Sequence, residues 1–79
     1  MTVAQAVALR IKDLCKQQNI TPNKLGKLSG VDPSTITSIF YGKSKNPGVA
    51  TLTKLCNGLD INIFQFFNNR VFEKNNLEC

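Results

Sequence analysis

Few side chains in this sequence could carry out catalysis. The 79 residues contain no histidine, and no predicted site pairs two carboxylates or holds a glycine-rich phosphate loop. The three cysteines form no CxxC pair, so the ligand spacing of a zinc site is also absent. Cys15 and Cys56 fall on apolar helical faces, which favours buried free thiols in a reducing cytoplasm. We therefore exclude an enzyme and expect neither a metal nor a cofactor.

The side chains best placed for recognition are hydroxyls. Ser34, Thr37 and Ser38 are predicted to share the exposed side of a short helix that ends near Tyr41. Such hydroxyls can donate to or accept from the edges of nucleic-acid bases, and threonine can pack on a thymine methyl group. They lack the bidentate selectivity of Arg or Gln, and a plain solvated face has the same composition. This cluster alone leaves both interpretations open.

The charge balance narrows the class of partner. Ten Lys and Arg oppose five Asp and Glu, which gives a net charge of +5, and the whole excess lies within residues 1–69. Such an excess favours nucleic acid or an anionic surface as partner, although a merely soluble surface would also carry it. The apolar N-terminal segment is interrupted by Gln5 and Arg10, so we expect neither a signal peptide nor a membrane span.

Capping residues and hydrophobic periodicity predict where the first three helices lie. The first covers residues 3–18. Thr21 and Asp32 are N-caps, each followed by a proline at the first helical position, and they start the second and third helices. Gly30 and Gly42 are expected to end these two helices.

Two more helices complete an all-α domain over residues 1–68. The fourth is expected over residues 49–58, and a capping box of Asn62 with Gln65 starts the fifth. The apolar side chains expected to face the core are Val3, Val7, Ile11, Leu14, Cys15, Leu25, Leu28, Ile36, Ile39, Phe40, Leu52, Leu55, Cys56, Leu59, Ile63, Phe66 and Phe67. No alternating pattern typical of a strand is present.

The second and third helices are joined by the short segment Ser29-Gly30-Val31-Asp32. A pair of short helices with a tight, glycine-containing turn is the arrangement that lets the second helix lie in the major groove of DNA. The stretch from Thr21 to Gly42 meets this requirement, so the sequence predicts a helix-turn-helix.

An ordered set of residues extends over the predicted helices. It consists of Arg10-Ile11-Lys12-Asp13-Leu14, Thr21, Leu25-Gly26, Leu28-Ser29-Gly30-Val31-Asp32, Ser34-Thr35-Ile36, Ile39, Gly42-Lys43, Asn46-Pro47, Leu52, Leu55-Cys56 and Leu59. This set resembles the Cro/phage-repressor (XRE) family of helix-turn-helix domains. The resemblance implies a five-helix lambda-repressor-like DNA-binding domain, usually a dimer on an inverted-repeat operator.

The resemblance also implies roles for individual side chains. The expected contacts to bases are Ser34, Thr37 and Ser38, and the expected contacts to the DNA backbone are Asn23, Thr35, Tyr41, Lys43, Ser44, Lys45 and Asn46. The last four match the loop that in the family holds the backbone just past the recognition helix. Asn23 is included because Pro22 stands where the family often has a phosphate-binding Gln, and a neighbouring polar residue can take its place.

Besides Pro22, three more positions depart from the family pattern. Cys15 and Phe40 stand where an Arg and a Glu commonly pair between the first and third helices. Because replacing both partners by packed apolar groups can be neutral or stabilising, we predict that these two side chains touch. Gly26 stands where Ala is usual, and it permits close packing against the third helix at a cost in helix propensity.

The end of the chain supplies candidates for self-association. The tail, residues 69–79, has only Val71, Phe72 and Leu77 to bury, so we expect it to be partly ordered at most. Phe64 stands at a position that should be exposed, and with Val71 and Phe72 it could form an apolar patch for dimerisation.

We expect a cytoplasmic, sequence-specific transcriptional regulator, a repressor, that binds double-stranded DNA as a homodimer and has no membrane partner. The weak selectivity of its hydroxyls implies that operator shape contributes to specificity. Arg10, Lys12 and Lys16 are expected to be solubilising charges behind the recognition helix. Two alternatives stay open: a protein-interaction module that keeps the fold, favoured by the uncharged third helix, and an antitoxin-like regulator that acts with a protein partner.

Overall fold

The computed structural model describes residues 1–43 and 47–77 of the protein. In these residues the chain forms five α-helices and two short 3-10 helices, without a strand. The elements are α1 Val3–Gln18, α2 Pro22–Ser29, α3 Pro33–Phe40, α4 Val49–Gly58, α5 Ile63–Phe67, η1 Arg70–Phe72 and η2 Lys74–Asn76. The predicted all-α class is confirmed, and the first and fourth helices have the predicted bounds.

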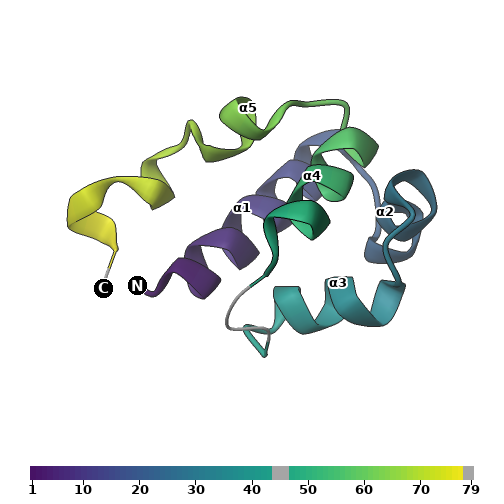
Figure 1. The fold of residues 1–79 in the computed structure, drawn as a ribbon, viewed down its shortest axis with the longest axis horizontal. Helices are drawn as coiled ribbons and strands as arrows, with labels where there is room; N and C mark the ends of the chain where they lie inside the picture. The colour runs from purple at the N-terminus through teal and green to yellow at the C-terminus, as the bar shows by residue number, and fades with distance from the viewer. Residues whose placement is uncertain (44–46, 78–79) are drawn as a thin grey trace.

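Figure 1 shows α1 crossing the centre of the molecule with the other elements around it. The second helix, α2, packs against both α3 and α4, and α3 also packs against α1. After α4 the chain turns back, so that α5 contacts α4 and η1 contacts α1. The α3 helix lies along one edge of the molecule, which leaves part of its surface uncovered (Figure 1).

Side-chain caps determine where the helices start. Thr21 accepts a hydrogen bond from an amide in the first turn of α2, and Asn62 forms the predicted capping box with Gln65. A second capping box, Thr2 with Gln5, starts α1, which periodicity alone did not indicate. Because the first amides of a helix have no partner within it, each cap stabilises its helix.

One hydrophobic cluster fills the interior and draws on all five α-helices. Its buried members are Val7, Ile11, Leu14, Cys15, Leu25, Val31, Ile36, Ile39, Leu52, Leu55, Cys56, Leu59 and Phe66, and Ile20, Phe40, Ile61 and Phe72 pack against them. Most of the residues predicted to face inward belong to this cluster.

Four residues predicted to face the core are exposed instead. They are Val3, Leu28, Ile63 and Phe67, with exposed fractions of 51%, 48%, 38% and 40%. In α2 the buried residues are Leu25 and Gly26, and Leu28 lies about 110° around the helix axis from their midpoint. Val3 occupies the first turn of α1, and α5 buries only Phe66. A short helix covers the core with one narrow face, and a few apolar positions do not determine which face that is.

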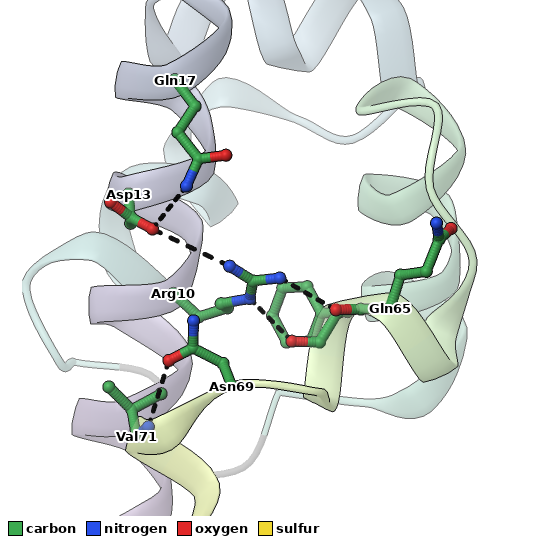
Figure 2. Close-up of polar contacts among 7 residues, drawn as sticks. Arg10, Asp13, Gln17, Gln65, Asn69 and Val71 are labelled. Atoms are coloured by element: carbon green, nitrogen blue, oxygen red, sulfur yellow. Dashed lines mark hydrogen bonds and ion pairs between the residues drawn. The ribbon is translucent and has the colours of Figure 1, made fainter.

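Arg10 ties α5 to α1 (Figure 2). Its Nε donates to the carbonyl oxygen of Phe66 and its Nη2 to that of Gln65, both at 2.8 Å. The side chain is 10% exposed and also lies 3.8 Å from the Asp13 carboxylate. The expectation of a solubilising surface charge was therefore wrong for Arg10. A cation is favoured here because the carbonyls at the end of a helix carry partial negative charge.

Within residues 69–77 the half-buried apolar residues are Val71, Phe72 and Leu77, the three that the sequence offers for burial, and residues 73–76 are exposed. Asn69 accepts a hydrogen bond from the Val71 amide at 3.1 Å and so caps η1 (Figure 2). The Phe72 ring lies 5.8 Å from the Phe66 ring and 4.7 Å from the Phe67 ring, centroid to centroid. Aromatic pairs at such distances stabilise the contact beyond the area they bury. Through the Phe72 ring, η1 contacts the hydrophobic core.

Candidate nucleic-acid interface

The predicted helix-turn-helix is formed by α2, the turn that follows it, and α3. Gly30 adopts a φ of 73° at the end of α2, a conformation that glycine reaches without steric cost. At Gly26 an added Cβ atom would lie 3.0 Å from the Val31 carbonyl oxygen and 3.2 Å from Pro33 Cγ. The missing side chain therefore lets α2 pack closely on the start of α3, as the sequence predicted.

The recognition helix α3 has one apolar and one polar side. Ile36 and Ile39 are buried. Among the predicted contact residues on the other side, Ser34, Thr35 and Thr37 are exposed and Ser38 is half-buried. Around the helix axis the three predicted base contacts fall within about 100° of one another, and Thr35 lies to one side of them. The structure thus brings these hydroxyl groups together on the uncovered edge of α3.

Two of these hydroxyls have hydrogen-bond acceptors inside the chain. Ser34 Oγ donates to Asp32 Oδ1 at 2.7 Å, and Thr37 Oγ1 donates to the Pro33 carbonyl oxygen at 3.0 Å. Their oxygens keep free lone pairs. In this arrangement they can accept from the amino groups of adenine or cytosine and contact thymine methyl groups.

Asp32 places a negative charge at the N-terminal end of α3. Its carboxylate accepts from the Ser34 hydroxyl and from the Ser34 amide at 2.8 Å, and these bonds hold the pKa of Asp32 below its ordinary value, the hydroxyl more than the amide. The partial positive charge of a helix N-terminus favours a carboxylate in this position. Asp32 therefore both starts α3 and orients Ser34.

Exposed cations and polar residues flank α3 at both ends. Asn23, Lys24 and Lys27 are exposed on α2, and Lys43 follows α3, where Tyr41 is 72% exposed. These positions suit the phosphates on either side of a groove. The other predicted backbone contacts, Ser44, Lys45 and Asn46, lie outside the described residues.

Cys15 and Phe40 belong to one hydrophobic cluster, Cys15 as a buried member and Phe40 half-buried against it. Side chains in separate clusters would have overturned the prediction that Cys15 and Phe40 touch. The shared cluster is consistent with that prediction. Burial raises the pKa of the Cys15 and Cys56 thiols; for Cys56 the Arg10 charge acts weakly in the opposite direction. Both cysteines are free.

Lys12 lies beside the end of α3, although the sequence predicted a solubilising charge behind the recognition helix. Its Nζ is 6.0 Å from the centroids of both the Phe40 and the Tyr41 rings. The signal in the sequence was indirect: Lys12 precedes Cys15 by one turn of α1, and Cys15 was predicted to meet α3.

The described residues offer neither a metal site nor a membrane-spanning helix. Residues 1–43 and 47–77 contain no group of three or more His, Cys, Asp or Glu side chains that could hold a metal ion. Within the same residues, no helix has the length and apolar character needed to cross a membrane.

A small all-α fold with this helix pair and an uncovered polar face on its second helix defines a class, the helix-turn-helix DNA-binding proteins. Comparison with known families agrees with this class. Residues 11–66 match the family HTH_3, helix-turn-helix, and the chain belongs to that family.

Two solved structures are similar to this chain over most of its length. The prophage Lp1 protein 11 has 32% sequence identity and a TM-score of 0.81, with 94% of this chain and 97% of that chain covered. An HTH_3 family transcriptional regulator from Vibrio cholerae has 30% identity and a TM-score of 0.79 over 85% of this chain. This chain spans only 37% of the length of the Vibrio cholerae protein. No curated protein sequence matches it.

Proposed function

We propose that the protein is a cytoplasmic, sequence-specific regulator of transcription that represses by binding an inverted-repeat operator as a homodimer. The observation that supports this most directly is the uncovered polar face of α3 next to the tight turn after α2. This geometry allows a recognition helix to enter a major groove about 12 Å wide. An operator occupied in this way is closed to other proteins that need the same DNA.

In this proposal Ser34, Thr37 and Ser38 contact bases. The DNA backbone is held by Asn23, Thr35, Tyr41, Lys43, Ser44, Lys45 and Asn46. Because hydroxyls discriminate weakly between bases, the shape and deformability of the operator add to its recognition.

An exposed apolar patch on α5 supports the homodimer. Phe64 is 74% exposed, as the sequence predicted, and Ile63 and Phe67 are exposed on the same short helix. Val71 and Phe72 are half-buried, and the Phe72 ring packs within the chain, so the two contribute less to the patch than expected. A two-fold contact between two such patches would bury them both.

Selection from random DNA duplexes with the purified chain, at near-physiological salt, tests the proposal. We expect enrichment of an inverted repeat whose half-sites lie about one helical turn apart. Enrichment of nothing beyond bulk DNA, with weak and salt-sensitive binding only, would instead support the protein-interaction module. That alternative is favoured by one observation, the Ser34 and Thr37 hydroxyls that already donate within the chain.

Substitution of the hydroxyls tests which residues contact bases. The double variant Thr37→Ala with Ser38→Ala should bind random duplexes almost as the wild type does, but should discriminate less between the selected operator and random DNA. Unchanged discrimination would place the base contacts elsewhere on the surface.

A further inference from the structure

We propose that Lys12 of α1 is a DNA-backbone contact that Phe40 and Tyr41 hold at the C-terminal end of α3. This inference rests on the proposed function and adds a residue to its binding surface. Its first support is distance: the Lys12 Nζ lies 6.0 Å from the centroid of each ring. A cation over aromatic faces at this range is attracted by the ring quadrupoles, which restrict where the ammonium can lie.

The surroundings place this ammonium on the binding side of the molecule. Lys12, Phe40 and Tyr41 line one open groove of about 980 Å³ between α1 and the end of α3. Tyr41 is 72% exposed and Lys43 is exposed two residues later, so two cations and one phenol lie near the same end of the recognition helix.

The charge of Lys12 is available for a ligand. Lys12 is exposed, and among residues 1–43 and 47–77 no carboxylate forms an ion pair with it. The neighbouring Asp13 carboxylate is engaged by Arg10 at 3.8 Å and accepts from Gln17 Nε2 at 2.8 Å. The aromatic rings therefore orient the ammonium without neutralising its charge.

The dimensions of α3 indicate what lies beyond this ammonium. Its eight residues span about 12 Å, which equals the width of the major groove. When a helix of this length contacts base edges along its exposed face, its ends approach the sugar-phosphate backbones that border the groove. A lysine fixed at that end would meet a phosphate oxygen and not a base.

The test is the salt dependence of DNA binding, measured by fluorescence anisotropy on the selected operator and on a random duplex. For Lys12→Gln we expect the negative slope of log K against log salt to become shallower by about 0.9 on both duplexes. Binding should be about fivefold weaker at 0.15 M salt. Lys12→Arg should retain the wild-type slope. Lys74→Gln, which removes the same charge from η2, should also retain it.

Each other result decides a separate point. A Lys12→Gln slope equal to that of the wild type, with operator preference intact, overturns this inference and leaves the proposed function standing. A wild type that prefers no sequence overturns the proposed function, while the slope on the random duplex still decides whether Lys12 contacts the backbone. A wild type that binds no duplex overturns both.

Discussion

Asp32 connects helix formation with recognition through a single side chain. Its carboxylate caps α3 through the Ser34 amide and also accepts from the Ser34 hydroxyl, a predicted contact to a base. The hydroxyl is oriented before any DNA arrives, so its rotamer entropy is already lost in the free protein.

The stability that Asp32 provides should depend on pH. The folded-state pKa of Asp32 lies below its ordinary value of 3.8, so its contribution is present above that pH and is lost as pH falls through the folded-state pKa. Asp32→Asn keeps a capping oxygen but cannot titrate. Thermal unfolding followed by circular dichroism should show the wild-type advantage in Tm over this variant shrinking between about pH 5 and pH 2. An advantage that is constant over this range would contradict the assignment.

At the scale of helices, Arg10 links α5 to α1 through two hydrogen bonds. Arg10→Met removes two hydrogen bonds to the end of α5 and should lower the free energy of unfolding by about 1.5–3 kcal/mol, because bonds from a charged donor are the stronger kind. Hydrogen exchange should show the amides of α5 losing protection first.

The matched control for this prediction is Asp13→Asn. Asp13 is 52% exposed and lies 3.8 Å from Arg10, so this ion pair should be worth less than about 1 kcal/mol. If the two substitutions cost the same, the bonds to the α5 carbonyls are not what holds α5 in place.

A second glycine permits a close approach of two helices, here of α2 and α4. A Cβ atom at Gly58 would lie 2.8 Å from Ser29 Cβ and 2.9 Å from the Ser29 backbone nitrogen. Gly58→Ala should destabilise the fold by about 1–2 kcal/mol net, because overpacking exceeds the gain in helix propensity. Asn57→Ala, at an exposed neighbouring position, should stay within about 0.5 kcal/mol in the same denaturant titration. A Gly58→Ala chain as stable as the wild type would show that the two helices can separate freely.

Local signals in the sequence predicted the helices well, but the sequence did not indicate the long-range contacts between them. Thr21 and Asp32 start their helices as predicted because each cap bonds to an amide only three or two positions away. Leu28 was misplaced because two turns of helix do not determine which face is buried. The partners of Arg10 lie 55 and 56 residues further along the chain, and the aromatic partner of Lys12 lies about 28 residues further. The spacing of residues in the sequence does not indicate such distant partners.

For the molecule as a whole, the α5 patch should govern assembly. In the proposed dimer, Phe64→Asp should favour the monomer, because joining two α5 patches would then bury uncompensated carboxylates. Analytical ultracentrifugation with and without operator measures this directly, and operator binding should weaken in parallel.

Val49→Asp provides the comparison for Phe64→Asp. Val49 is also 74% exposed, but it starts α4 and lies outside the patch, so its substitution should leave the sedimentation coefficient unchanged. A wild-type chain that is monomeric both free and on DNA would exclude the dimer.

The hydrogen bonds of Arg10 would also affect how much variation in the spacing between two half-sites a dimer could tolerate. If two chains join through α5, the separation of their recognition helices depends on how firmly α5 is held against α1. One extra base pair between half-sites rotates one of them by about 34° around the DNA axis, which a rigid pair cannot follow. Loosening α5 would then widen the range of spacer lengths that are accepted while the preferred half-site sequence stays the same.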